Sequence, residues 1–178
     1  GGIYRDVSLR IVNQVYIENV FAKPVDILTK NPKLNVRTYF EDLRYTTFSL
    51  KIELLDGEKI IDYAQSLVPD AQPKKSTGFT LTKLKSITLW DSNNPKLYTV
   101  RVSLIDGVKI IDQYETHIGF REAKFTENGF FLNGKHLKLR GLNRHQTYPF
   151  VGNAMPARVQ KRDAWILKKE LKCRSEER

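Results

Sequence analysis

Residues 54–62 read LLDGEKIID, and residues 104–112 read LIDGVKIID. Each stretch places an Asp-Gly pair between two short apolar segments. Such a pair is typical of the two-residue turn of a β-hairpin, because that turn needs positive φ, which Gly tolerates and Asp accepts better than most residues. Two copies are too few for a solenoid. The repeat therefore predicts two similar hairpins within one sandwich.

Alternating apolar and polar residues mark the strands around these turns. Residues 34–40, 48–54 and 98–104 each place apolar side chains at every second position. Such strands bury one face and expose the other, as in an antiparallel sandwich. About seven strand-like segments fall between residues 15 and 118, so the predicted fold class is mainly β, an immunoglobulin-like antiparallel β-sandwich. Residues 3–11 alternate in the same way and predict one more strand ahead of it.

The composition predicts a folded chain without a membrane partner. The sequence has 178 residues, and 40% of them are hydrophobic, which is enough to bury a core. No apolar run approaches the roughly 18 residues needed to cross a bilayer. Cys173 is the only cysteine, so an internal disulfide and a paired-cysteine metal site are both excluded. A lone thiol agrees with a reducing compartment, and the cytoplasm is the favoured location.

The net charge of +10 is concentrated near the C-terminus. From residue 134 onward there are 12 Lys/Arg against 4 Asp/Glu, whereas the first 133 residues carry 18 against 16. A basic region of this kind can bind nucleic acid, meet an acidic partner or form a solvated helix face. We expect no nucleic-acid partner, because the basic residues are spread over several elements and no known binding motif accompanies them.

The stretch from residue 119 to residue 156 ends the strand pattern and begins a different one. Asn-Gly pairs at residues 128–129 and 133–134 are turn signals that predict a small hairpin. Residues 157–173 follow a helical pattern, although two acidic positions, Asp163 among them, interrupt its apolar face. The chain therefore changes from a sandwich to a hairpin and a helix.

Five ordered blocks of the sequence are distinctive. Three of them form the junction just described, and two others lie in the sandwich region and at the N-terminus. The blocks are GFR at 119–121, GFFLNGK at 129–135, LRGLNRH at 139–145 with its continuation QTYPFVGNAMP, LWD at 89–91 with NPKLY at 94–98, and GIYRDV at 2–7. Together these blocks resemble glycoside hydrolase family 2, most closely a bacterial β-galactosidase.

The resemblance implies three domains in a fixed order. Residues 1–13 would be the end of an N-terminal jelly-roll sugar-binding domain. Residues 14–119 would be the immunoglobulin-like sandwich. Residues 120–178 would be the start of a TIM-barrel catalytic domain, a truncated (β/α)8 barrel represented by a hairpin and one helix.

The parent protein would hydrolyse terminal β-D-galactosides with retention, using two carboxylates about 5 Å apart. In the family both carboxylates lie further along the barrel than residue 178. Glu176 and Glu177 belong to a charged tail without a fixed scaffold, and we assign them no catalytic role. The chain is therefore expected to be a fragment that holds no catalytic residue and is inactive alone.

Two residues are candidates for substrate binding by resemblance. His145 matches the family histidine at the end of the first barrel strand, which lines the sugar pocket; its alternative role is that of an ordinary loop histidine. Asn143 matches the same motif, and it and Arg144 also suit a role in holding the loop in shape. His117 and His136 are expected to have no site role.

The resemblance also implies the cofactors and partners. This fragment would hold no cofactor and no metal, while the parent protein would use Mg²⁺. The parent would bind a β-galactoside substrate and form a homo-oligomer.

A different class of function stays open. The chain could be a free-standing β-sandwich module that binds carbohydrate or a protein partner. That function would require Trp90, Tyr98 and Tyr148 to form an exposed aromatic platform. The alternative for Trp90 is that it plugs one end of the sandwich.

Overall fold

The computed structural model describes residues 3, 5–42, 47–68, 76–145, 147–173 and 175–177, with backbone only for Asp42 and residues 175–177. The chain forms two compact units. We call Ile11–Lys124 with Phe131–Lys135 the sandwich unit, and Gly1–Arg10, Phe125–Phe130 and His136–Arg178 the helical unit. Each unit is described separately below.

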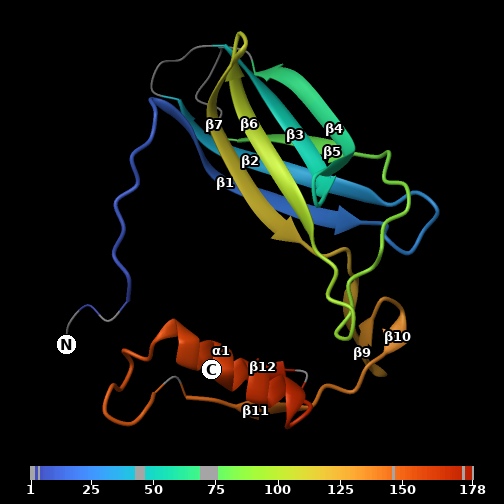
Figure 1. Ribbon diagram of the computed structural model, residues 1–178. Helices are drawn as coiled ribbons and strands as arrows, with labels where there is room; N and C mark the ends of the chain where they lie inside the picture. Colours follow the sequence, from blue (N-terminus) through green and yellow to red (C-terminus); the bar gives the residue numbers. More distant parts are fainter. Residues whose placement is uncertain are drawn as a thin grey trace. The chain divides into compact units, whose positions relative to one another are not determined.

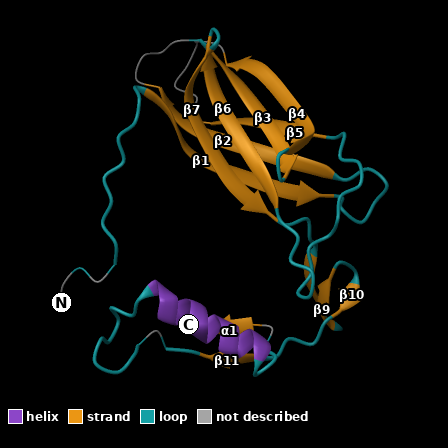
Figure 2. Ribbon diagram, viewed as in Figure 1, coloured by secondary structure: helices purple, strands orange, loops and turns teal. Residues whose placement is uncertain are grey.

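Two antiparallel sheets build the sandwich unit (Figure 1). The first sheet has the order β1-β2-β5, and its strands are β1 (Val15–Val25), β2 (Lys33–Asp42) and β5 (Ser76–Leu81). The second has the order β4-β3-β6-β7, and its strands are β3 (Phe48–Asp56), β4 (Lys59–Val68), β6 (Tyr98–Asp106) and β7 (Lys109–Ile118). The mainly β fold class predicted from the alternation is confirmed (Figure 2).

The core lies between these two sheets and is formed by the predicted apolar faces. Most of its members are buried side chains at alternate positions of β1, β2, β3 and β6. The apolar side chains that are at most 1% exposed are Val15, Ile17, Leu34, Val36, Leu50, Ile52, Leu54, Leu81, Val100, Val102, Leu104 and Phe120. Burial of one face per strand is what the period-two pattern requires.

Both Asp-Gly pairs form the predicted hairpin turns, with φ of 61° at Gly57 and at Gly107. Each hairpin also has an irregularity that the repeat did not predict. The register shifts between Leu54 and Leu55 in the first hairpin and between Leu104 and Ile105 in the second. A bulge of this kind inserts one residue and turns the following side chain.

The bulges place the last residue of each repeat, Asp62 or Asp112, where it binds the opposite sheet. The Asp62 carboxylate accepts the backbone N–H of Lys83, just after β5, at 2.9 Å. The Asp112 carboxylate accepts the backbone N–H of Ile17 in β1 at 2.7 Å. The two repeats therefore tie the two edges of one sheet, β4 and β7, to the other sheet.

The strand predicted at residues 3–11 is not formed. Residues 5–13 adopt no regular structure, and Val7, Leu9 and Ile11 are each more than three-quarters exposed. Alternation creates an apolar face, but a strand also needs a neighbouring edge for its backbone groups. The sequence also predicts a polar connector over residues 69–76, because this stretch contains two prolines, and all of it except Ser76 lies outside the described residues.

The next three strands along the chain form a small sheet of order β10-β9-β8, and the two Asn-Gly turns connect these strands. It consists of β8 (Ala123–Thr126), β9 (Gly129–Leu132) and β10 (Lys135–His136). Positive φ at Asn133 (51°) and Gly134 (75°) agrees with a hairpin turn of the kind predicted. Then come β11 (Gly141–Asn143), α1 (Ala157–Lys169) and β12 (Ser175–Glu177). Within the described residues, no helix is long and apolar enough to cross a membrane.

Candidate functional site

The helical unit contains a β-α-β element. β11 and β12 pair in parallel, with Gly141 opposite Ser175 and Asn143 opposite Glu177, and α1 lies between them in sequence. The family resemblance predicted a barrel strand and a helix here, and Glu176 and Glu177 were predicted to lie in a tail without a fixed scaffold. The pairing of β12 shows that this last prediction is wrong for the backbone of residues 175–177. Parallel strands end at the same edge, and side chains at that edge form the active sites of α/β barrels.

Arg144 anchors the end of β11 to the helix. Its side chain is 11% exposed. The guanidinium group donates to one carboxylate oxygen of Asp163, at 3.1 Å from Nε and 2.8 Å from Nη2, and Nη2 also lies 2.7 Å from Oε1 of Gln160. These contacts hold α1 against Arg144, which lies between the two predicted site residues, Asn143 and His145. The loop-holding role suggested for Arg144 is therefore what its contacts show.

The loop between β11 and α1 closes over this anchor. Met155 is 4% exposed, and its Sδ lies 3.8 Å from Nη2 of Arg144. The backbone N–H of Gly152 donates to the carbonyl of Tyr148 at 2.9 Å, which makes a tight turn in the loop. The amide nitrogen of Gln160 is buried beside the anchor without a partner in the described part of the chain.

Asn143 and His145 flank Arg144 and both are exposed. Asn143 is the last residue of β11, and His145 follows two residues later, so both lie at the C-terminal end of a parallel strand. That position suits side chains that meet a substrate. Their assignment to substrate binding stays a prediction. His117, by contrast, belongs to the sandwich unit, where it lies on β7 and contacts Thr99 at 3.2 Å.

Two acidic residues lie on α1 and at its C-terminal end. Asp163 is held by Arg144, and Glu170 is the C-cap residue, whose backbone N–H donates to the carbonyl of Ile166. The side chains of Glu176 and Glu177 are outside the description. No group of three His, Cys, Asp or Glu side chains able to hold a metal ion occurs among the residues that the structure describes.

The aromatic platform required by the alternative function does not form. Tyr98 is 2% exposed, packs edge-on against Phe120 with ring centroids 5.3 Å apart, and accepts the N–H of Thr88 at its hydroxyl. A residue buried in this way cannot share a surface with Trp90 and Tyr148. That version of the sugar-binding module is therefore wrong.

Trp90 belongs to the end of the sandwich unit rather than to a sugar site. Its backbone N–H donates to the carbonyl of Phe120 at 2.9 Å, and its carbonyl accepts from the side chain of Asn133 at 2.9 Å. The Arg121 guanidinium lies 4.6 Å from the centre of its ring. A Cβ on Gly119 would lie 2.8 Å from three Trp90 atoms. Two residues of the Gly-Phe-Arg block, Gly119 and Arg121, therefore pack against the Trp90 side chain.

An immunoglobulin-like sandwich followed by a hairpin and a parallel β-α-β element is the arrangement expected where a support domain precedes an α/β barrel. The class of protein that the fold defines is therefore a β-sandwich domain joined to a short α/β segment. A family model, Glycosyl hydrolases family 2, matches residues 15–121, and the chain belongs to that family.

Curated relatives agree with this membership. A β-galactosidase of Thermoanaerobacterium thermosulfurigenes is 44% identical over 175 residues, which cover 96% of this chain and 24% of that protein. A β-galactosidase of Thermoanaerobacter pseudethanolicus is 37% identical, over 96% of this chain and 23% of that protein. The chain spans about a quarter of the length of these relatives.

Solved structures share the fold. A β-glycosidase from Bacteroides vulgatus matches with a TM-score of 0.83 and 25% identity, over 98% of this chain and 22% of that one. β-Glucuronidase 3 of Bacteroides uniformis matches with a TM-score of 0.76 and 29% identity, over 94% of this chain and 20% of that one. The relatives therefore include enzymes named for two different sugars.

Proposed function

We propose that this chain is part of a retaining glycoside hydrolase that acts on terminal β-D-galactosides. Its contribution would be the support sandwich and the first β-α-β element of the catalytic barrel. The observation that carries the proposal is the 44% identity to a β-galactosidase across 96% of this chain. Identity is lower, 29%, to the structurally similar β-glucuronidase, which favours galactosides over glucuronides.

In this proposal the chain positions the substrate and does not perform the bond-breaking step. Asn143 and His145 would contact the sugar from the end of β11, while the Arg144–Asp163 pair holds that strand end in place. Retaining hydrolysis needs an acid/base carboxylate and a nucleophilic carboxylate, which we propose lie elsewhere in the parent protein. The chain alone is then inactive.

A chimera tests the proposal directly. Residues 15–173 would replace the matching segment of the T. thermosulfurigenes β-galactosidase, and hydrolysis of a chromogenic β-galactoside would be compared with that of the matching β-glucuronide. We expect the chimera to cleave the galactoside, and His145→Ala to lower kcat/KM by about 100-fold or more. A folded chimera that cleaves only the glucuronide, or neither substrate, would contradict the proposal.

The isolated chain supplies the complementary test. We expect it to release no chromophore from either glycoside. Turnover by the isolated chain that is abolished by Glu176→Gln or Glu177→Gln would show that the carboxylates reside in this segment after all. His117→Ala in the chimera is the matched control for His145→Ala, because His117 lies in the sandwich unit.

The cofactor and partner assignments remain proposals for the parent protein. We propose that Mg²⁺ binds to residues other than those described here, since these contain no three-ligand group for it. We also propose a homo-oligomeric parent in a reducing cytoplasm, without nucleic-acid or membrane partners. The single cysteine supports the reducing compartment.

A further inference from the structure

The outer face of the sheet β1-β2-β5 has a groove of about 440 Å³. This volume falls within the range of small-molecule sites, roughly 300–1,000 Å³. Phe21 of β1, Arg37 and Tyr39 of β2, and Gly78 of β5 are among the residues that line it. The side chains of Phe21, Arg37 and Tyr39 point away from the core, because Val20 of β1 and the alternate residues of β2 are the buried ones.

Gly78 leaves space in the groove, and no contact among the described residues requires a glycine there. Its φ is not in the left-handed region, and an added Cβ would meet only the carbonyl oxygen of Val36, at an ordinary 3.8 Å. A glycine inside a strand weakens it and often marks a place where a ligand approaches the backbone. Gly78 lies directly opposite Arg37 on the neighbouring strand. The missing side chain therefore leaves open space beside a cation.

The groove combines aromatic, cationic and hydrogen-bonding groups. Phe21 is 58% exposed and lies opposite Arg37 on the side away from Gly78. Lys23 and Arg37 both line the groove, and neither has an ion-pair partner within the described residues. No acidic residue is among the lining residues.

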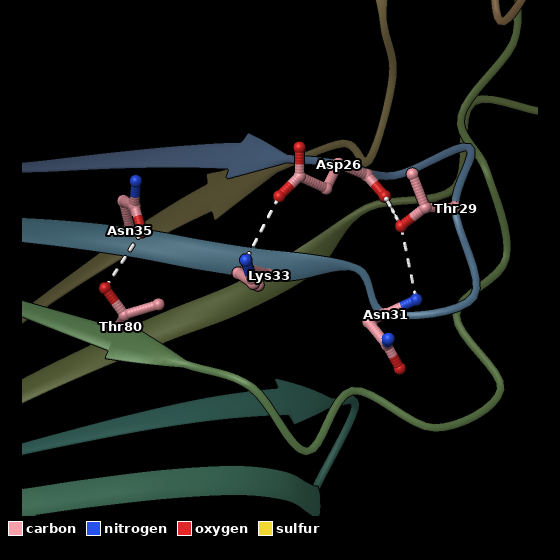
Figure 3. A network of polar contacts seen from close by, with 6 residues as sticks. All are labelled: Asp26, Thr29, Asn31, Lys33, Asn35 and Thr80. Atoms are coloured by element: carbon pink, nitrogen blue, oxygen red, sulfur yellow. Dashed lines mark hydrogen bonds and ion pairs between the residues drawn. The ribbon is translucent and has the colours of Figure 1, made fainter.

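Asn35 and Thr80 provide an oriented polar edge. The Thr80 hydroxyl donates to Oδ1 of Asn35 at 3.0 Å, across the neighbouring strands β5 and β2 (Figure 3). Because this bond occupies Oδ1, the Asn35 amide nitrogen is left to donate elsewhere. Both residues line the groove.

We propose that this groove binds an acidic saccharide, whose anionic group is a carboxylate or a sulfate. The anion pairs with Arg37 and Lys23, since a guanidinium binds planar oxyanions with two hydrogen bonds. The apolar face of the sugar ring packs on Phe21, and its hydroxyls accept from Asn35. The site lies on the sandwich unit and does not depend on the catalytic function proposed above.

A titration of the isotope-labelled chain tests the site. The probes are methyl β-D-glucuronide, the neutral methyl β-D-glucoside, glucose 6-sulfate and sodium acetate, and the readout is the shift of backbone amide signals. We expect saturable shifts in β1, β2 and β5 with the glucuronide or the sulfated sugar, at a Kd of about 1 mM or tighter. The glucoside and acetate are expected to bind about tenfold more weakly or worse.

Two substitutions separate binding from folding. Gly78→Thr fills the hollow and adds a β-branched residue to a strand, so it should abolish binding while Tm stays equal or rises. Arg37→Gln should weaken binding about tenfold or more. Lys59→Gln is the charge control, because Lys59 is exposed on β4 of the other sheet.

Every outcome of the titration either supports or overturns the proposed saccharide site. Preference for the glucuronide or for the sulfated sugar identifies which anion the groove accepts. Equal binding of the neutral glucoside, equal binding of acetate, or shifts that survive Gly78→Thr would each overturn the proposal. The absence of saturable shifts with every probe would also overturn it, and none of these results bears on the chimera's activity.

Discussion

Asp62→Asn should lower the free energy of unfolding of the sandwich unit by about 2 kcal/mol. Asp62 is 9% exposed, and its two carboxylate oxygens accept the backbone N–H groups of Tyr63 and Lys83, each at 2.9 Å. An asparagine keeps only one oxygen, and its amide group then faces the other N–H. The loss is one hydrogen bond to a charged group, worth roughly 1.5–3 kcal/mol. For a unit of this size it corresponds to a Tm lower by roughly 8 °C.

Urea unfolding measures this loss. A Trp165→Phe background leaves Trp90 as the single tryptophan, and Trp90 lies in the sandwich unit. The midpoint should fall while the slope against urea stays the same, because the unfolded surface is unchanged. Glu58→Gln removes the same charge from the exposed tip of the same hairpin and should change stability by less than about 0.5 kcal/mol.

The second repeat extends the test. Asp112→Asn should also destabilise the unit, because the Asp112 carboxylate holds the N–H of Ile17. β4 and β7 are the two edges of one sheet, three strand spacings or about 14 Å apart. The two losses should therefore add within about 0.5 kcal/mol. If Asp62→Asn and Glu58→Gln change the free energy of unfolding by the same amount, the Asp62 carboxylate does not tie the two sheets together and the reasoning is refuted.

Three further substitutions follow from individual contacts. Gly119→Ala should cost about 1–3 kcal/mol and shift Trp90 fluorescence, since the new methyl group would lie 2.8 Å from Trp90 atoms; an unchanged spectrum and midpoint would contradict this. Thr38→Val should raise the free energy of unfolding by about 1 kcal/mol, because the fully buried Thr38 hydroxyl has no partner in the described structure; urea midpoints decide it. Arg144→Met should lower the free energy of unfolding of the helical unit by about 2 kcal/mol and speed amide exchange in α1, because it removes the ion pair with Asp163. Arg144→Lys should recover part of the protection from exchange. Equal exchange in the unmodified chain and in both variants would show that Arg144 does not anchor α1.

The strands and turns were predictable because their signals are local. Alternation over seven residues identified β2, β3 and β6, and the Asp-Gly pairs located both hairpin turns. Residues 3–11 carried the same alternation and formed no strand, because pairing depends on a neighbouring edge that the pattern does not report. The helix ends at Lys169, four residues earlier than predicted, and Lys172 then adopts φ of 54°, which is outside the helical region.

The inter-sheet ties were missed for a different reason. Both repeats were interpreted as hairpins, and no contact was predicted for the final Asp of either copy. The bulge shifts the register by one residue and so turns that Asp toward the other sheet. The sequence did hold a signal for these contacts, because Asp62 and Asp112 both follow an Ile-Ile pair at the same position of the repeat. A charge that is buried at the same place in both copies needs a polar partner in each.

The candidate site was predicted in part. The family resemblance placed Asn143 and His145 at a strand end, whereas Asp163 was noted only as an interruption of an apolar helix face. The structure explains that interruption, because Asp163 faces Arg144. A charged residue on the inner face of an amphipathic helix is therefore a reason to look for a partner in the preceding strand.

The β11–α1–β12 element leaves apolar side chains exposed, which bears on the proposal that it begins a barrel. Its strands have three residues each, no residue of α1 is buried, and Leu142 and Trp165 remain about half exposed. Parallel strands occur where both faces of a sheet are covered, and a two-stranded sheet is marginal by itself. The sandwich unit, by contrast, has a fully buried core of its own. Further parallel strands and helices would bury the exposed side chains of the element, and this physical need, independent of any sequence similarity, supports the proposal that it begins a barrel.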